Sequence, residues 1–242
     1  MANVVSDSLG IYRDNIRLII LFSIPFLIAF LIPLLAPLPT YISTGAIFLR
    51  TASIFVNTNP TVLAVVTIST FVSMLFISFA FVAISLIVKS EKTHMATSKR
   101  VMLEIEKYIS RVFSILLFYA FIVIILNISS YLFSFPVIWA EALNLIIFLL
   151  IFYMPTAMVI DNKGFFASFK GSIRLVVTSP KYVVLWLVLF AAATSFVDLV
   201  FSGLFGVAGS YVTLVINSVF ILPYFVIFIA EAYIRRFPLL RH

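Results

Sequence analysis

Long apolar runs alternate with short polar segments along the whole chain. A helix needs about 20 predominantly apolar residues to cross the hydrocarbon core of a bilayer, and six runs approach or exceed this length. The sequence therefore predicts an all-α, polytopic membrane protein with six transmembrane helices, folded as a single integral membrane domain over residues 1–242. The predicted spans are residues 16–38, 61–88, 112–134, 142–160, 182–203 and 210–234.

The polar segment at residues 161–181, DNKGFFASFKGSIRLVVTSPK, is periodic at helical spacing. Large apolar residues gather on one side of such a helix, and serines and basic residues gather on the other. This pattern predicts an amphipathic helix at the membrane surface with its basic side toward the lipid headgroups. The apolar side carries Phe165, Phe166, Phe169, Ile173 and Val176, and the polar side carries Ser168, Lys170, Ser172 and Arg174.

Two further surface helices are predicted. Residues 89–111 are the most charged part of the chain, and an apolar stripe within them predicts an amphipathic helix that enters the third span. Residues 1–15 predict a short surface helix. The unit of surface helix, span, turn and span occurs three times with an irregular period, which raises the possibility of three repeated helix-hairpin units. These units begin and end at about 1–38, 97–160 and 164–234.

The distribution of basic residues predicts the orientation. If both termini and residues 89–111 and 163–181 share one side of the membrane, that side holds 15 of the 16 Lys and Arg residues. Only Arg50 falls on the opposite side. Because basic residues stay on the cytoplasmic side, the sequence predicts a multi-pass protein of the cell membrane with cytoplasmic N- and C-termini.

Two segments leave alternatives open. The apolar stretch after Arg13 and Arg17 also fits a removed signal peptide. Retention is favoured, because no small-residue cleavage pattern follows at the right distance and removal would leave an odd number of spans. In the outer loop at residues 39–60, the stretch AIFLRTASIFV is too short to span, so it either lies at the interface or re-enters the membrane.

Composition narrows the classes of function. Hydrophobic residues make up 64% of the chain and charged residues 10%, so the chain could not cover itself in water. The net charge of +7 does not indicate nucleic acid, because the basic residues punctuate apolar runs and form no single face. The chain has no cysteine, and its two histidines are His94 in a loop and His242 at the end. We therefore expect no catalytic site, no metal site and no cofactor.

One polar layer is predicted inside the spans. Asp198 stands about 25 Å along the fifth helix, and the same arithmetic gives Asn127, Asn144 and Asn217 a similar depth on three other helices, with Ser73 nearby. This layer either lines an outward-open vestibule that binds a cation or small polar ligand, or has a structural role. In the structural role, which is the commoner one, its side chains hydrogen-bond helix to helix or meet water where the spans end. Asp198 is the best single candidate for a site.

Other polar residues within or beside the spans have structural explanations. Glu231 lies four residues before Arg235, which favours an interfacial salt bridge over catalysis. Asp161, close to Gly164, is expected to start or cap the surface helix rather than to bind an ion. The prolines inside spans either kink helices or break them to form a substrate site, and kinks are the commoner outcome. They are Pro25, Pro33, Pro155 and Pro223.

Residues 161–175 carry a pattern in which an acidic residue and a glycine precede Ala-Ser-x-Lys-x-Ser-x-x-Leu. This pattern resembles the membrane domain attached to some glycerophosphodiester phosphodiesterases and its stand-alone six-span relatives, the YciC-type membrane proteins. The resemblance implies a fold and a membrane location. It does not imply phosphodiesterase activity, because the catalytic acids and histidines of the soluble domain have no counterpart here. The matching positions are Asp161, Gly164, Ala167, Ser168, Lys170, Ser172 and Leu175, with Pro155 upstream.

Three functions are compatible with the sequence. The first is a channel or transporter-like bundle of unknown substrate, and the second is a non-catalytic membrane partner or scaffold that assembles or anchors other membrane proteins. The third, an enzyme acting on lipid, is disfavoured because reactive groups are few. The expected partners are the lipid bilayer, anionic lipid headgroups at the cytoplasmic face, and either further copies of the chain or another membrane protein.

Overall fold

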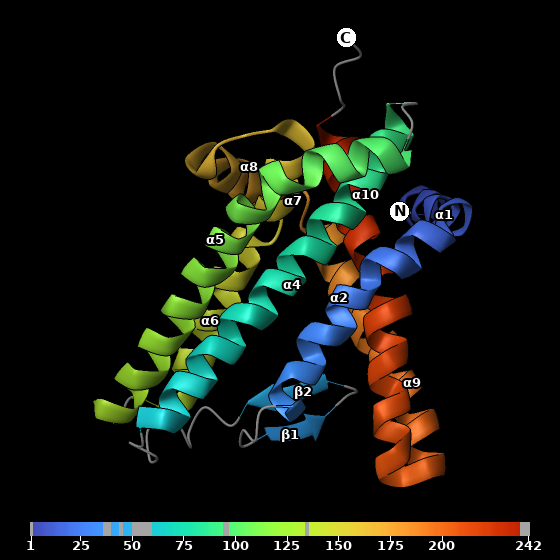
Figure 1. Cartoon of the computed structure of the whole chain (residues 1–242). Coiled ribbons are helices and arrows are strands. Elements are labelled where there is room, and N and C mark those ends of the chain that lie inside the picture. Colours follow the sequence, from blue (N-terminus) through green and yellow to red (C-terminus); the bar gives the residue numbers. More distant parts are fainter. Residues whose placement is uncertain are drawn as a thin grey trace.

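The structure, a computed structural model, describes residues 2–35, 40–43, 46–49, 60–93, 97–133 and 136–237, and these residues are almost entirely helical (Figure 1). The first helices are α1 (Ala2–Asp14), α2 (Ile16–Leu35), α4 (Pro60–Lys92) and α5 (Thr97–Leu132). They are followed by α6 (Val137–Ile151), α7 (Met154–Asp161), α8 (Phe165–Thr178), α9 (Pro180–Ile216), the π-helix η1 (Asn217–Ile221) and α10 (Leu222–Arg236).

Several of these helices are long and apolar enough to cross a membrane. Within the described residues there are four such segments, and a fifth if α1 and α2, which are bent by 93° at their junction, are counted as one span. This confirms the prediction of an all-helical protein with several segments that could cross a membrane. The four segments are Leu63–Lys92, Glu104–Ser130, Ile138–Asp161 and Pro180–Arg236.

The segment Pro180–Arg236 folds back on itself at Gly206. Its 57 residues would extend about 85 Å as one straight helix, nearly three times the hydrocarbon thickness. Gly206 has φ 57° and ψ −132°, a conformation that only glycine adopts readily, and it reverses the chain. Two contacts join the limbs on either side of this turn. Ser202 Oγ lies 3.2 Å from Ser210 Oγ, and Trp186 Nε1 donates to the carbonyl of Phe225 at 3.1 Å. The segment is therefore an antiparallel helical hairpin.

Charged helix ends gather at one end of the molecule. In Figure 1, α1, α8, the start of α5 and the end of α10 lie together, whereas β1, β2, the start of α4 and the lower turn of α9 lie at the other end. We call the first of these the basic end. Its described basic side chains include Arg13, Lys89, Lys92, Lys107, Arg111, Lys163, Lys170, Arg174, Arg235 and Arg236.

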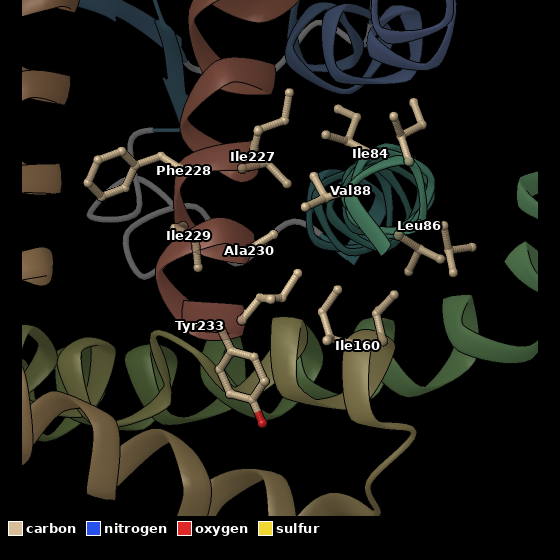
Figure 2. Packing of buried hydrophobic residues seen from close by; sticks show 14 of the residues in the cluster. Ile84, Leu86, Val88, Ile160, Ile227, Phe228, Ile229, Ala230 and Tyr233 are labelled. Carbon is tan, nitrogen blue, oxygen red and sulfur yellow. The ribbon is translucent and has the colours of Figure 1, made fainter. Parts of the chain in front are cut away.

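The hydrophobic core lies in the half of the bundle nearest the basic end. Residues 82–90 of α4 and 225–234 of α10 are all buried, and both helices contact α7. Figure 2 shows side chains of the three helices, among them Val88, Ile160 and Ile227, in the space between them. The first half of α4 instead exposes large apolar side chains. A surface of this kind suits contact with lipid, so the end opposite the basic end is the more loosely packed half.

One local feature was not predicted. Part of the outer loop forms a two-stranded antiparallel sheet, in which β1 (Thr40–Ser43) pairs with β2 (Ala46–Leu49). The first four residues of AIFLRTASIFV form strand β2, and the rest of that stretch lies outside the described residues. Its location at the interface or in a re-entrant segment stays a prediction. Four residues are too few to cross a bilayer, and pairing with β1 satisfies their backbone groups.

The hairpin predicts opposite effects of one substitution at two glycines. A Cβ on Gly209 would lie 1.9 Å from the carbonyl oxygen of Phe201 on the facing limb, whereas a Cβ on Gly203 would meet nothing within 4 Å. We expect Gly209→Ala to lower the free energy of unfolding by about 1–3 kcal/mol, because the limbs must separate. We expect Gly203→Ala to be neutral or stabilising, because alanine favours helix. Thermal unfolding in detergent measures both, and equal effects would contradict the close approach at Gly209.

Candidate functional site

The most promising polar group inside the bundle is centred on Asp198. Its side chain is half-buried on α9 and accepts a hydrogen bond from Ser202 Oγ at 2.7 Å. Ser202 Oγ also lies 3.2 Å from Ser210 Oγ on the opposite limb of the hairpin. A chain of polar atoms thus crosses from one limb to the other at this point.

The hairpin continues this polar group toward the basic end. On the first limb, Thr194, Asp198 and Ser202 are spaced four residues apart, so they share one face of the helix. On the return limb, Ser210, Thr213 and Asn217 are spaced three and four residues apart and also share a face. Because Ser202 and Ser210 are in contact, the two faces meet at this point of the hairpin. We call this set the polar seam: Thr194, Asp198, Ser202, Ser210, Thr213 and Asn217.

The polar seam is largely withdrawn from the surface. Thr194, Thr213 and Asn217 are each at most 8% exposed. Thr194 Oγ1 donates to the carbonyl of Phe190 within its own helix at 2.8 Å. Thr213 Oγ1 is buried and has no hydrogen-bond partner among the described residues. A buried polar atom of this kind is costly unless it finds a hydrogen-bond partner.

A change in helix type begins at the seam. Residues Asn217–Ile221 form a π-helix, and Pro223 follows within α10. Proline has no backbone N–H, so it removes one bond of the α-helical ladder, and π-helical turns are often found at functional sites. The sequence predicted a kink or a break at Pro223, and the structure contains an altered helical turn just before it.

The four predicted site residues fall into two pairs. Asp198 and Asn217 belong to the hairpin of α9, η1 and α10. Asn127 lies on α5 and donates to the carbonyl of Val123 at 2.8 Å, and Asn144 lies on α6 and is 8% exposed. The predicted layer is thus divided between two helical hairpins. A joint role of the four residues as one ligand site stays a prediction.

The motif on α8 is oriented differently from the prediction. Ser168 and Ser172 are fully buried with Leu175, whereas Lys170 and Arg174 are exposed. The prediction that the serines face the headgroups together with the basic residues was therefore wrong. Small side chains allow α8 to approach α6 and α7 closely, which the periodicity of polar residues alone does not reveal.

Ser172 supports the break between α6 and α7. The helix is interrupted at Phe152 and Tyr153, just before Pro155. Phe152 N still donates to the carbonyl of Leu149, but Tyr153 N donates to Ser172 Oγ at 3.0 Å. A side chain of the surface helix therefore satisfies a backbone group that the broken helix leaves unpaired.

Asp161 does not cap α8, contrary to the prediction. It is the last residue of α7, Gly164 occupies the N-cap position of α8, and no side chain caps that helix. Asp161 Oδ2 instead accepts hydrogen bonds from Lys163 Nζ at 2.5 Å and Tyr233 OH at 2.6 Å. Asn162, in the left-handed conformation with φ 53°, ends α7 and turns the chain. The acidic residue of the motif thus ties the α7–α8 connection to α10.

Glu231 forms the predicted salt bridge and a second one. Its carboxylate lies 3.4 Å from Arg235 Nε, as the spacing of four residues predicted, and 3.0 Å from Lys92 Nζ. Glu231 is only 2% exposed, and Arg235 also pairs with Asp7 of α1. These ion pairs connect α4, α10 and α1 at the basic end.

Sequence reasoning missed the role of Lys89. This residue is 8% exposed, and its Nζ donates to the carbonyl of Val159 at 3.0 Å and lies 3.8 Å from Glu104 Oε2. Lys89 follows directly on an apolar run, and we assigned it to the charged segment of residues 89–111 that was predicted to lie at the membrane surface. The charge is instead buried between α4, α5 and α7.

The described residues contain no group of three or more His, Cys, Asp or Glu side chains placed to hold a metal ion. His94 and His242 lie outside these residues.

The two serines of α8 give a matched test. Ser172→Ala removes the acceptor for Tyr153 N and leaves a buried donor unpaired, so we expect a loss of about 1–2 kcal/mol in stability. Ser168 is equally buried, but its Oγ has no hydrogen-bond partner within the described residues. We expect Ser168→Ala to be neutral or slightly stabilising. Thermal unfolding in detergent measures the stability of both variants. Equal losses of stability would show that the hydrogen bond between Tyr153 N and Ser172 Oγ is not the cause.

Comparisons with known proteins give no match: no family model, no curated protein and no solved structure matches the chain. The resemblance of residues 161–175 to the membrane domain of glycerophosphodiester phosphodiesterases therefore stays a prediction.

Proposed function

We propose that the protein is a six-span, transporter-like membrane protein with its basic end in the cytoplasm, and that the polar seam around Asp198 binds a small cation or polar solute. The single observation that carries the transport proposal is a carboxylate inside a membrane-crossing hairpin, bonded to hydroxyl groups and aligned with further buried polar side chains.

The lengths of the helices support six crossings. Helices α2, α4 and α5 provide one crossing each, α6 and α7 together provide a fourth, and the two limbs of Pro180–Arg236 provide the fifth and sixth. The connections then alternate between the basic end and the opposite end. Because Lys and Arg are retained in the cytoplasm, this arrangement puts both termini there.

The surroundings of Asp198 support binding of a cation. A carboxylate is expensive in hydrocarbon unless it finds a partner, so carboxylates within spans are often functional. In the described part of the chain, no Lys or Arg forms an ion pair with Asp198, and its partner is the hydroxyl of Ser202. The negative charge is therefore free to be balanced by a bound cation or a proton.

The interrupted helices support transport over a purely structural role. Many transporters bind their substrates beside discontinuous helices, where backbone groups can reach a ligand. Here α6 is interrupted at Phe152 and Tyr153, and the return limb of the hairpin becomes a π-helix at Asn217. The second interruption begins within the polar seam.

Asp198→Asn tests the transport proposal directly. Purified protein is reconstituted in liposomes, and proton, sodium and potassium fluxes are each followed with a trapped ion-sensitive dye. We expect at least one flux above that of empty liposomes, and a fall of about tenfold or more in Asp198→Asn, because the variant cannot provide the charge. Glu141→Gln is the matched control: it removes an exposed carboxylate of α6 and should leave the flux unchanged.

Equal fluxes in the wild type and in Asp198→Asn would remove the polar seam from the transport proposal. If the wild-type protein gives no flux with any of the three ions, while a membrane protein co-purifies with it in constant ratio, the scaffold function becomes the better explanation.

Single cysteines test the six-span arrangement, because the natural chain has none. Val207 follows the Gly206 turn and Thr178 ends α8, and both are exposed. In intact cells, a membrane-impermeant maleimide should label Val207→Cys but not Thr178→Cys. Permeabilisation should make Thr178→Cys reactive. The reverse pattern would invert the orientation, and labelling of both in intact cells would contradict six crossings.

A further inference from the structure

A groove at the basic end lies between α5 and the connection from α7 to α8. Its volume is about 440 Å³. The groove is lined by one basic side chain, by polar groups and by apolar side chains. None of its lining residues belongs to the polar seam. The lining residues are Arg111, Ser114, Met158, Asn162, Gly164 and Phe165.

The polar part of the groove is suited to a phosphate group. Arg111 Nη1 donates to Asn162 Oδ1 at 3.0 Å, which holds the guanidinium at the groove. A guanidinium has five N–H donors, so most of them remain for an anion, and Arg binds phosphate through parallel hydrogen bonds. Lys107, one turn earlier on α5, is exposed and adds positive charge. The neighbouring acids Glu104 and Asp161 are already paired with Lys89 and Lys163.

An apolar surface leads away from the groove along α5. Ser114, Phe118, Phe121 and Ile125 follow Arg111 at spacings of three and four residues, so all five lie along one side of the helix. Phe118, Phe121 and Ile125 are each at least 45% exposed, and Phe118 packs edge-on against Phe165 of the groove. From Arg111 to Ile125 this surface runs for about 21 Å. That length exceeds half the thickness of the hydrocarbon core, which is the reach of one acyl chain.

We propose that this groove binds an anionic phospholipid. The phosphate lies at Arg111 and Asn162, and one acyl chain lies along the exposed side chains of α5. A basic side chain above a strip of exposed apolar residues matches both parts of such a lipid. The inference needs the basic end to lie at a membrane surface, as in the six-span arrangement. It does not depend on transport, so an unchanged flux in Asp198→Asn would leave it intact.

A specific groove differs from general attraction between a basic surface and anionic lipid. Arg174 of α8 is exposed at the same end of the molecule but does not line the groove. Each surface Lys or Arg contributes to general attraction to a similar extent. Only Arg111 contributes through directed hydrogen bonds in a groove, so the two arginines separate the two explanations.

The experiment measures lipid binding by native mass spectrometry of the full-length protein in detergent, titrated with phosphatidylglycerol or with phosphatidylcholine of the same acyl chains. We expect the wild type to prefer phosphatidylglycerol. Arg111→Gln should weaken phosphatidylglycerol binding about tenfold, because charge-assisted hydrogen bonds are lost. Arg174→Gln should weaken it less than twofold. Equal losses in the two variants, or no loss in Arg111→Gln, would overturn the proposal.

A second measurement uses the wild-type protein and does not require any variant to fold. Phosphatidylglycerol with a photoreactive diazirine on one acyl chain is incorporated with the protein into lipid nanodiscs and activated by light. The adducts should concentrate on residues 114–125 of α5 and on Phe165. Adducts spread evenly over the exposed faces of α4, α6 and α9 would overturn the proposal.

Discussion

The fold depends on one constraint: every backbone N–H and C=O group inside the membrane must find a partner within the protein. An unbroken helix provides these partners through its own backbone hydrogen bonds. Other partners are needed only where the helical hydrogen bonds are interrupted. At Tyr153, the freed N–H donates to Ser172 of the surface helix. At Gly206, the chain reverses at the end of the bundle opposite the basic end. At Asn217, a π-helical turn maintains the bonding in a different register. The first of these contacts explains why α8 is packed closely against the break between α6 and α7.

The two halves of the bundle differ in packing and in the pairing of their charges. At the basic end, buried charges such as Lys89 and Glu231 are paired with groups from other helices. Breaking such a buried pair leaves an uncompensated charge and is strongly destabilising, so these contacts hold the helices in fixed positions. The opposite half has fewer buried apolar side chains and contains Asp198. The bundle thus has a closely packed half with paired charges and a less buried half in which Asp198 is half-buried.

The positions of Asp198 and Asn217 along their helices could be predicted, but their association in one polar seam could not. The depth of Asp198 and Asn217 follows from counting residues along a helix of known rise. Their association into one seam depends on how each limb is rotated about its own axis. A helix that is apolar on all sides has no periodic pattern that predicts this rotation. The same limit explains the wrong orientation of Ser172, since a small polar residue is compatible with either a headgroup face or a tightly packed helix face.

The sequence by itself determined the helices that are long and apolar enough to cross a membrane, the gathering of basic residues at one end and the turn between residues 203 and 210. Hydrocarbon thickness sets the length of an apolar run, and charge is too costly to be placed at random along it. The tertiary structure alone decided which side chains meet. Contacts such as Asp161 with Tyr233, and Lys92 with Glu231, join residues 72 and 139 positions apart in the chain. Such contacts arise from how the helices pack together, and no local pattern of residues encodes them.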